Sequence, residues 1–531
     1  MFARTLRVGC RRASSRGLRT ASLPQKSTRR RYSNASSATA TNAAPASSPV
    51  AALGGLTSEL DKLSPRFDVN ASQIRILKDP SEFYETLKAK ISTAQKRVYL
   101  STLYIGKKEH ELIATVRDAL KRNPELKVSF LTDALRGTRE TPDPSCATLL
   151  ASLVQEFGPH RVEVCMYHTP NLTGIRKALL PKRINEGWGL QHMKLYGVDD
   201  EIIMSGANLS DDYFTNRQDR YHLISSKEIA DYFEKIHKTV CTISYQVTPS
   251  SSAPGGFTLD WPSTKAQPEP LSDPTSYMNA ARGLLAPLLQ PSAIGTEASK
   301  REKTDTQLYP LLQLTPLLKA NDTSTELPAM NSILSRLASP GFRGSKWTFT
   351  AGYFNMTPWL RELLLASSSS SGTVVAASPW ANGFYGSKGV SGMLPAAYTY
   401  LGKTFLGSVS KAGLADKIKL KEWRRGTVNE AGGWTYHAKG LWITLPGDQG
   451  PCISIIGSSN YTKRSYSLDL EANVAIVTRN EGLMKRLGEE EAWLQEYAAV
   501  VDKSTFEKTQ RRVGLHVRIA MWIVTAVGGA L

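Results

Sequence analysis

Two segments of this chain repeat one short pattern, and the repeat constrains the fold more than any other feature. In each copy a histidine and a lysine stand two residues apart, and a turn of small residues ending in asparagine follows. Because residues i and i+2 of a strand project from the same face, each pair directs an imidazole and an ammonium group at one point. The copies run from His192 to Asn208 and from His437 to Asn460. We therefore expect a duplicated unit.

The spacing inside each copy is typical of a β-hairpin. The first copy is expected to reverse near Val198–Asp200 and the second across Pro446–Gly450, which places each histidine opposite its asparagine turn. Histidine and asparagine are 16 residues apart in the first copy and 23 in the second. The longer turn Leu445–Pro451, rich in glycine and proline, accommodates the extra residues. The arrangement is therefore expected to be the same in both copies.

A carboxylate follows each asparagine by eleven residues, Asp219 in the first copy and Glu471 in the second. A carboxylate suits the second nitrogen of an imidazole, because it holds the ring in one tautomer. We expect Glu471 to orient His437 in this way. Basic residues close to the two carboxylates are suited to a pyrophosphate or to a second phosphate on an acceptor; they are Arg217, Arg220, Lys463 and Arg464.

The paired motifs indicate a catalytic site. A lone histidine in a strand is more often structural than catalytic, but here two copies agree in histidine, lysine, asparagine and carboxylate. Two imidazoles with paired lysines and amides are the groups that phosphodiester chemistry requires in the absence of a metal ion. No group of residues has the spacing of metal ligands, and the five cysteines form no CxxC pair. We therefore expect neither a metal nor a cofactor in catalysis; the alternative is a metal ion that assists substrate binding.

Helical and strand-like segments alternate in the same order on both sides of a variable middle region, which favours α/β layers. The first half is expected over 59–245 and the second over 329–505. The stretch between them, 246–328, is expected to be an insertion or linker, because its Pro/Ser-rich and charged parts lack apolar periodicity. Besides the two motif hairpins, the predicted helices are Glu82–Ala94, Glu109–Arg122, Ala147–Phe157, Met330–Leu337, Trp359–Ala366 and Ala397–Val409, and the predicted strands are Arg97–Ile105, Leu126–Thr132, Arg161–Tyr167, Trp347–Phe354, Thr373–Ala377 and Lys417–Trp423.

The N-terminus carries much of the net charge of +19. Residues 1–58 contain no acidic residue, and residues 1–32 hold ten Lys and Arg; without these, 56 basic residues face 47 acidic ones, a net charge of +9. An acid-free, Arg- and Ser-rich N-terminus is typical of a mitochondrial transit peptide, which we expect over 1–32, followed by a disordered spacer over 33–58. The alternative is a basic arm that binds nucleic acid.

The C-terminal segment 506–531 ends in thirteen uncharged residues, Ile519–Leu531, preceded by Arg511, Arg512 and Arg518. Thirteen residues are too few to span a bilayer. We expect peripheral contact with a membrane surface, in which the arginines face anionic headgroups. The alternative is a final helix packed on the domain.

The two motifs resemble those of the phospholipase D superfamily, whose signature is a pair of His-x-Lys-x4-Asp motifs, each followed by Gly-Ser-x-Asn. The first copy has the full set up to Asp199, but carries Ser205–Asn208 in place of Gly-Ser-x-Asn. The second copy keeps Gly457–Asn460, but has Thr444 where the aspartate should stand. Asp199 is therefore expected to support its own hairpin, without a counterpart in the second copy.

Within the superfamily, the leader, the run Tyr213–Tyr221 and the second motif Tyr436–Trp442 are similar to the eukaryotic phosphatidylglycerophosphate synthase family. The resemblance implies a duplicated phospholipase D-like fold, two α/β/α sandwich halves with the active site at their interface. It implies transfer of a phosphatidyl group from CDP-diacylglycerol to glycerol 3-phosphate. It also implies peripheral association with the mitochondrial inner membrane on the matrix side, and no nucleic acid as a partner.

The resemblance further implies that His192 is a nucleophile that forms a phosphatidyl-histidine, and that His437 is the general acid and base. The lysines and asparagines of the motifs would hold the phosphoryl oxygens. The candidate site residues are, for catalysis, His192, Lys194, Asp199, His437 and Lys439; for substrate phosphates, Asn208, Ser458, Asn460, Arg217 and Arg464; and, for orienting the imidazoles, Asp219 and Glu471.

Other functions are open at this point. The same residues would serve a hydrolase that cleaves phospholipids or DNA ends with water, or a phosphatidyltransferase with a different acceptor. A non-catalytic protein that binds membranes or nucleic acid would explain the basic ends, but not the two imidazoles. Because the copies are nearly symmetric, the residues alone do not decide which histidine is the nucleophile.

Overall fold

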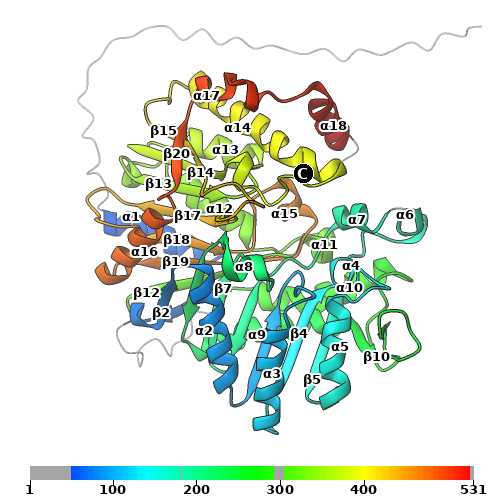
Figure 1. Cartoon of the computed structure of the whole chain (residues 1–531). Helices are drawn as coiled ribbons and strands as arrows, with labels where there is room; N and C mark the ends of the chain where they lie inside the picture. The colour runs from blue at the N-terminus through cyan, green and yellow to red at the C-terminus, as the bar shows by residue number, and fades with distance from the viewer. Residues whose placement is uncertain (1–48, 180, 292–303, 527–531) are drawn as a thin grey trace, which may run out of the picture. The chain divides into compact units, whose positions relative to one another are not determined.

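The computed structural model describes residues 49–179, 181–291 and 304–526 (Figure 1). Their strands form two nine-stranded sheets and one short two-stranded ladder. In spatial order, the first sheet consists of β11 (Phe257–Asp260), β10 (Tyr245–Pro249), β5 (Val162–Tyr167), β4 (Lys127–Asp133), β3 (Arg97–Ser101), β6 (Leu195–Val198), β7 (Glu201–Ser205), β9 (Tyr221–Ile224) and β2 (Ile74–Leu77). The second consists of β1 (Phe67–Val69), β12 (Thr306–Gln313), β19 (Glu471–Thr478), β18 (Ile453–Gly457), β17 (Lys439–Thr444), β13 (Lys346–Ala351), β14 (Ser371–Ala377), β15 (Ile418–Trp423) and β20 (Ala498–Val501).

The two sheets have the same topology, which confirms the duplication. The order β5-β4-β3-β6-β7-β9-β2 in the first sheet corresponds to β15-β14-β13-β17-β18-β19-β12 in the second. In both, the three strands joined by helices are parallel, and the motif hairpin and the strands beyond it are antiparallel. Parallel neighbours need a helical crossover, whereas the motif strands are joined by tight turns.

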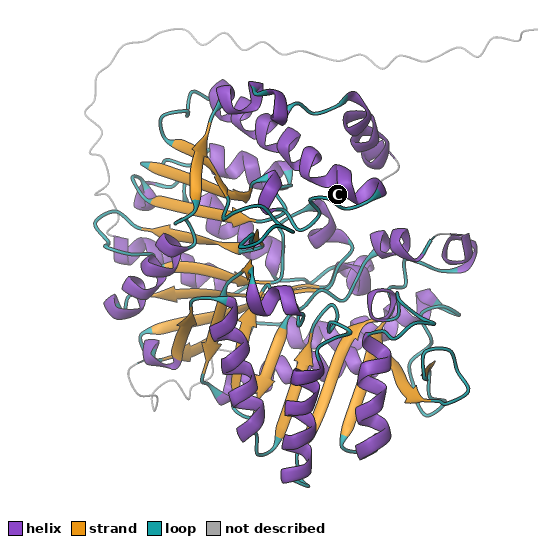
Figure 2. Cartoon of the chain, in the orientation of Figure 1, coloured by secondary structure: helices purple, strands orange, loops and turns teal. Residues whose placement is uncertain are grey.

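Helices cover both faces of the sheets (Figure 2). On the first sheet, α2, α3 and α5 share one core cluster with the sheet face beneath them, and α9 packs on the opposite face. The helices are α1 (Pro49–Leu60), α2 (Pro80–Thr93), α3 (His110–Arg122), α4 (Ala134–Gly137), α5 (Cys146–Phe157), α6 (Gly174–Leu179), α7 (Lys182–Asn185), α8 (Asp211–Thr215), α9 (Lys227–Thr242), α10 (Pro274–Leu285), α11 (Thr315–Leu318), α12 (Glu326–Arg336), α13 (Pro358–Leu365), α14 (Leu394–Lys411), α15 (Lys463–Ser467), α16 (Glu481–Trp493), α17 (Lys503–Glu507) and α18 (Leu515–Ala526).

The prediction that 246–328 is an insertion or linker is wrong. β10 and β11 extend the first sheet, and β12 lies inside the second sheet between β1 and β19. All eight residues of β12 are paired with β19, and six of its side chains from Leu308 to Gln313 are buried. Both faces of this strand are covered, so its sequence is a continuous apolar run. It therefore lacks the alternation of apolar and polar residues that predicts a strand with one exposed face.

The disordered spacer expected over 33–58 also disagrees with the structure in the part of that range that the structure describes. Residues 33–48 lie outside the described residues, as does the expected transit peptide. Residues 49–58, however, belong to α1, whose Leu53, Leu56 and Leu60 are buried in the core of the second half. The three leucines fall on one helical face, and this spacing outweighs the Ala- and Gly-rich composition around it.

A buried ion-pair network joins the two halves. Arg220, the residue before β9, donates to both carboxylate oxygens of Glu490 on α16 at 2.9 and 2.8 Å, and its guanidinium lies 3.8 Å from the centre of the Trp442 ring. His222 contacts the same carboxylate at 2.9 Å. Burial opposes ionisation of Glu490, but these two partners outweigh it and lower its pKa to about 2. Breaking such a buried pair typically costs about 3–5 kcal/mol, so the network fixes how the halves pack.

In the described part of the chain no helix is both long enough and apolar enough to cross a membrane. The C-terminal α18 is a single short helix that contacts α14, where Arg518 lies 5.6 Å from the Tyr400 ring centre. Arg511 is buried and paired with Glu422, so it does not face outward as expected from the sequence.

Candidate active site

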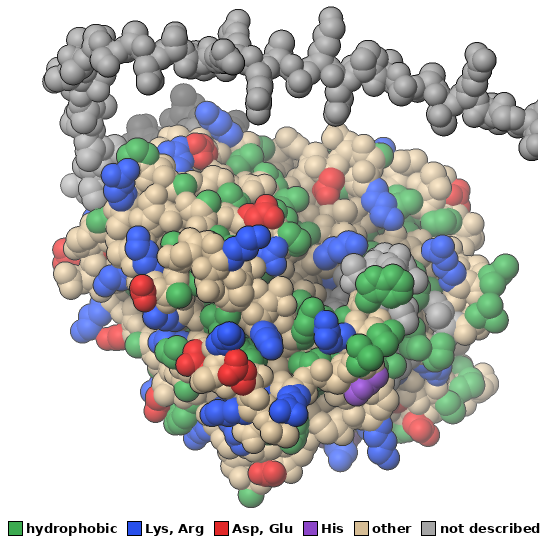
Figure 3. All heavy atoms as spheres, turned by 90° about the horizontal axis from the view of Figure 1, so that it is seen from above, with side chains coloured by type: hydrophobic (Ala, Val, Ile, Leu, Met, Phe, Trp, Pro, Cys, Tyr) green, Lys and Arg blue, Asp and Glu red, His purple; other side chains and the backbone are tan. Residues whose placement is uncertain are grey.

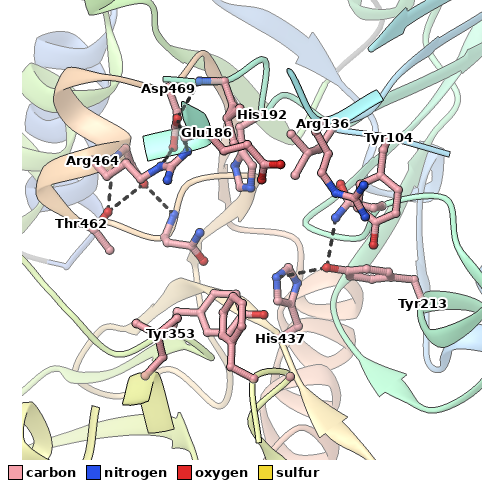
Figure 4. Close-up of a pocket in the computed structure, with 18 of the residues that line it drawn as sticks. Tyr104, Arg136, Glu186, His192, Tyr213, Tyr353, His437, Thr462, Arg464 and Asp469 are labelled. Atoms are coloured by element: carbon pink, nitrogen blue, oxygen red, sulfur yellow. Dashed lines mark hydrogen bonds and ion pairs between the residues drawn. The ribbon is translucent and has the colours of Figure 1, made fainter. Parts of the chain in front are cut away.

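Both histidine motifs open into one cavity between the two halves, with a volume of about 460 Å³ (Figure 4). The hairpins form as predicted: Val198 pairs with Glu201 in the first, and Ile443 with Ile453 in the second. His192 and His437 stand just before their strands and both line the cavity. The duplicated fold therefore brings the two imidazoles to a common site.

The carboxylates are exchanged between the copies. His192 contacts Glu471 of the second half through Nδ1, at 3.0 and 2.9 Å from the two carboxylate oxygens. His437 contacts Asp219 of the first half through Nδ1 at 2.6 Å. The expectation that Glu471 orients His437 is therefore wrong, although both carboxylates do hold an imidazole.

Backbone pairing between the halves explains the exchange. Gln191 forms a bridge with Leu470, so the next residues on the two segments, His192 and Glu471, lie side by side. In the second copy, β16 (Thr435–Tyr436) pairs with β8 (Arg217–Gln218), which aligns the residues that follow them, His437 and Asp219. Backbone N–H groups of both histidines donate across the same boundary, to Leu470 and Gln218. These pairings link segments hundreds of residues apart, so spacing within one copy could not reveal them.

Each imidazole is held in a defined tautomer. With Nδ1–H donated to the carboxylate, Nε2 of His192 and of His437 keeps its lone pair. Burial, followed by the nearby ammonium groups of Lys194 and Lys439 respectively, lowers the pKa of both imidazoles well below the usual value. Both rings are therefore neutral near pH 7 in the free protein, and a neutral Nε2 is competent as a nucleophile or a base.

The two motif lysines lie behind the imidazoles rather than in the wall of the cavity. Lys194 and Lys439 are almost completely buried, and each donates from Nζ to the carbonyl of its own histidine, at 2.7 and 2.8 Å. Lys439 Nζ is also 2.8 Å from Nδ1 of His437 and 3.6 Å from Asp219. Burial lowers the pKa of Lys439, and lowers that of Lys194 to about 7. Neither lysine lines the cavity.

Ser458 supports a carboxylate and does not line the cavity, contrary to the prediction that it binds phosphate. Its hydroxyl donates to Glu471, and it accepts from the backbone N–H of Ala472. The equivalent residue in the first copy is Gly206, where a Cβ atom would lie 2.8 Å from both Asp219 Oδ1 and Lys439 Nζ. The first copy therefore has glycine instead of the serine of Gly-Ser-x-Asn, because Lys439 occupies the space that a serine side chain would need.

Asp199 lies at the turn of the first hairpin, away from the cavity. It adopts a left-handed conformation, with φ of 50°, and its carboxylate accepts from the backbone N–H groups of Gln95, Lys96 and Arg97 at 2.8–3.1 Å. It therefore ties the hairpin to the loop before β3, as expected from the missing counterpart in the second copy. Its inclusion among the catalytic residues is wrong.

Four of the predicted phosphate-binding residues do line the cavity: Asn208, Asn460, Arg217 and Arg464. Arg217 pairs with Asp212 at 2.6 Å, and Arg464 pairs with Asp469 at 2.7 Å. The Nδ2 of Asn208 donates to the Tyr213 hydroxyl, which in turn lies 3.4 Å from Nε2 of His437. Arg220 belongs to the buried network described above and Lys463 is exposed, so neither contributes to the cavity.

The cavity also contains residues that the sequence analysis missed. Arg136 lies flat over the Tyr104 ring at 3.9 Å, and Arg139 pairs with Glu186. Asp133 accepts from the backbone N–H of Arg136 and of Gln191, and so holds this wall to the residue before His192. These residues stand outside the repeated motifs, and nothing in their local pattern marks them. The aromatic and aliphatic residues of the wall are Leu103, Tyr104, Leu190, Tyr213, Tyr353, Phe384, Leu394 and Tyr398.

One group in the described part of the chain has the geometry of metal ligands: Glu163, Cys165 and Cys241 lie with their ligand atoms within 4.8 Å of one another. They stand on β5 and α9, and none of them lines the cavity. Cys165 and Cys452 are fully buried in the core. No two of the described cysteines are joined by a disulfide.

Comparison with known proteins gives the chain relatives over most of its length. Residues 87–240 match the family described as "Cardiolipin synthase, PLD-like domain". A CDP-diacylglycerol–glycerol-3-phosphate 3-phosphatidyltransferase of Saccharomyces cerevisiae is 45% identical over 480 residues, which cover 89% of this chain and 91% of the relative. The human protein of the same name, described as mitochondrial, is 36% identical over 481 residues, which cover 86% and 83%.

The fold has a counterpart among solved structures. Phosphatidylserine synthase of Haemophilus influenzae aligns with a TM-score of 0.66 at 21% sequence identity, covering 90% of this chain and 98% of that one. At this identity the comparison concerns the fold alone. It agrees with two α/β halves around one interface.

The rate of the reaction in this cavity should depend on pH on both sides of neutrality. Burial raises the pKa of Glu471 to about 7, and it lowers that of Lys194 to about 7. Acidification then protonates the carboxylate that orients His192, and alkalinisation neutralises the ammonium beside it. We predict a bell-shaped profile of kcat/KM with its maximum near pH 7. In Lys194→Arg the guanidinium stays charged, so the alkaline limb of the profile should disappear. The exposed control Lys463→Arg should keep that limb. An unchanged alkaline limb in Lys194→Arg would contradict the assignment of this limb to Lys194.

Proposed function

The chain belongs to the family of CDP-diacylglycerol–glycerol-3-phosphate 3-phosphatidyltransferases, and we propose that it performs this transfer through a covalent phosphatidyl-histidine. It moves a phosphatidyl group from CDP-diacylglycerol to glycerol 3-phosphate, with release of CMP, as a step of phospholipid synthesis. The observation that carries the proposed mechanism is the pair of imidazoles at one cavity, each with Nδ1 held by a carboxylate. Two groups so placed can divide nucleophilic and acid–base work between them.

In the first step, Nε2 of His192 attacks the phosphorus that carries diacylglycerol. A nitrogen–phosphorus bond forms, the bond from phosphorus to the CMP oxygen breaks, and His437 in its protonated form gives its Nε2 proton to that oxygen. His437 is neutral in the free protein because burial and nearby cations lower its pKa. The negative charges of the bound pyrophosphate oppose this effect, so substrate binding favours the protonated ring.

In the second step, neutral His437 removes the proton from the 1-hydroxyl of glycerol 3-phosphate. The hydroxyl oxygen attacks the phosphorus and the nitrogen–phosphorus bond breaks, which restores His192 and leaves His437 protonated for the next cycle. The acceptor oxygen takes the position that the CMP oxygen left, since both lie opposite His192. One cavity therefore serves both steps, and His437 acts on both oxygens.

The remaining cavity groups suit the charge of the substrates. Arg217 and Arg464 each keep a planar guanidinium at the wall, fixed by one aspartate, and can pair with phosphate oxygens. Asn208 and Asn460 present amides beside the histidines, where charge develops in the transition state. Lys194 and Lys439 act through their positive charge from behind the imidazoles, because their ammonium groups bond to backbone carbonyls there.

Peripheral membrane contact at the matrix side of the mitochondrial inner membrane is part of this proposal. Two exposed segments adjoin elements that line the cavity. On α18, Leu515 and Trp522 are 68% and 71% exposed, and α18 contacts α14, which carries Leu394 and Tyr398 of the wall. Figure 3 views the molecule from above, and hydrophobic side chains lie there beside lysines and arginines.

The second segment contains α6 and α7, next to Glu186 of the cavity. Ile175 and Leu179 are 78% and 77% exposed, and Ile184 is 51% exposed. Between Gly174 and Asn185 the sequence has four basic residues and no acidic one. Exposed apolar side chains among basic ones favour an anionic lipid surface, which is where a substrate with two acyl chains resides.

The two-histidine mechanism predicts which variants form the covalent intermediate. With labelled CDP-diacylglycerol and no acceptor, wild type should carry the label on His192, as an acid-labile and alkali-stable phosphoramidate, and His437→Ala should form the same adduct more slowly, because CMP then leaves without a proton donor. His192→Ala should carry none, and both variants should lose at least about 10³-fold in turnover while folding normally. His160→Ala, which removes an exposed histidine, is the control. Label on another residue, or near-normal turnover of His437→Ala, would refute the mechanism; DNA-end cleavage without lipid product would refute the function.

The membrane proposal predicts binding to vesicles of phosphatidylcholine with about one-fifth anionic lipid. Replacing Ile175, Leu179 and Trp522 together with serine removes three exposed apolar groups, and should weaken vesicle partitioning at least tenfold. Val500→Ser, which removes an exposed valine on the edge strand β20, should have little effect. Equal partitioning of the triple variant and wild type would contradict the assignment of this surface.

A further inference from the structure

Three aromatic rings form a continuous wall of the cavity. Tyr353 follows β13, Phe384 lies in the loop before α14, and Tyr398 stands on α14. The ring centre of Tyr353 is 5.3 Å from that of Phe384 and 5.8 Å from that of Tyr398, with the two tyrosine rings nearly parallel at 23°. We call these three residues the aromatic wall.

The aromatic wall faces the cavity and takes no part in the hydrophobic clusters found among the described residues. The neighbouring Phe354, by contrast, points into the core of the second half and packs on Phe405. All three rings of the wall are only partly buried. The exposed parts of these rings line the cavity and can contact a flat group of a ligand.

The wall lies beside one of the two histidines. The ring of Tyr353 meets that of His437 edge-on, with centres 5.2 Å apart (Figure 4). Near His192 the lining contains no such group of rings: Leu190 belongs to a small apolar cluster of the first half, and Glu186, Arg464 and Asp469 lie close by (Figure 4). The cavity is thus aromatic on the side of the general acid, whereas leucine and charged side chains line it on the side of the nucleophile.

This difference indicates that different parts of the substrate lie on the two sides of the cavity. The inference rests on the proposed function. CMP departs from the side of His437, because His437 protonates its oxygen. We propose that Tyr353, Phe384 and Tyr398 bind the cytosine base of CDP-diacylglycerol by stacking. The acyl-bearing part of the substrate then lies toward the leucines.

A guanidinium next to the wall supports a nucleotide ligand. A Cβ atom on Gly383 would lie 3.0 Å from Nη2 of Arg217 and 3.1 Å from the Tyr353 hydroxyl, so glycine at this position lets the two approach each other. Arg217 can then hold a phosphate while the adjacent rings hold the base. Burial raises the pKa of the Tyr353 hydroxyl, which keeps it protonated and able to donate to a carbonyl or ring nitrogen of the base.

Stacking on aromatic side chains changes affinity by about 5- to 150-fold for each base. We therefore expect Phe384→Ala and Tyr398→Ala to raise the KM for CDP-diacylglycerol, and the inhibition constant of CMP, by about tenfold or more. The KM for glycerol 3-phosphate should stay within about twofold, because the acceptor has no base. Inhibition by ribose 5-phosphate, which keeps the sugar phosphate and lacks the base, should also be unchanged.

A matched control is available in the same loop. Tyr385 is exposed and lies next to Phe384 without lining the cavity. Tyr385→Ala should behave as wild type. Where an alanine variant does not fold, Phe384→Leu keeps the apolar volume and removes the stacking face, so it gives the same test.

Two outcomes would overturn the proposal. In one, CMP and ribose 5-phosphate lose inhibition equally, which would assign the rings to the sugar phosphate. In the other, CMP inhibition is unchanged in an active variant. Absence of lipid product with the wild-type protein would instead refute the proposed function, so the two failures are distinguishable.

Discussion

The site depends on the exchange of carboxylates between the two halves. Each imidazole comes from one half, and the carboxylate that fixes its tautomer comes from the other: Glu471 for His192 and Asp219 for His437. The backbone bridges just before these residues enforce the exchange, because they align each histidine segment with the carboxylate segment of the opposite sheet. Neither half alone provides both an imidazole and the carboxylate that contacts it, so this arrangement requires that both halves be packed together.

Burial of these charged and titratable groups shifts their pKa values. The imidazoles, carboxylates and motif lysines are almost entirely shielded from water. Burial disfavours the charged form of every one of them, which raises the pKa of Glu471 and lowers that of Lys194. Glu471 and Lys194 carry opposite charges on the same side of the site, and the lowered pKa values of both imidazoles keep the rings neutral near pH 7 in the free protein.

The repeated pattern predicts the duplication and the hairpins correctly, since alternation and spacing are local properties, and the structure places both motif histidines at one cavity. The pattern does not predict features that depend on contacts between segments distant in the sequence. The partner of His437, the role of Ser458 beside Glu471, and the place of β12 inside the second sheet all follow from contacts between distant residues. Arg136 and the aromatic wall lie outside the repeat, and single aromatic or basic residues carry no local signal. The helix α1 can be predicted from the sequence, because its three leucines are spaced along one helical face.

The exchange of carboxylates can be measured through the nitrogen shifts of the imidazoles. In protein labelled with ¹⁵N-histidine, His192→Ala and His437→Ala assign the signals of the two rings that line the cavity. Glu471→Gln should then shift the ring nitrogens of His192 and leave those of His437 in place, and Asp219→Asn should do the reverse. A shift of His437 in Glu471→Gln, with His192 unchanged, would show that each copy supplies its own carboxylate and would contradict the account.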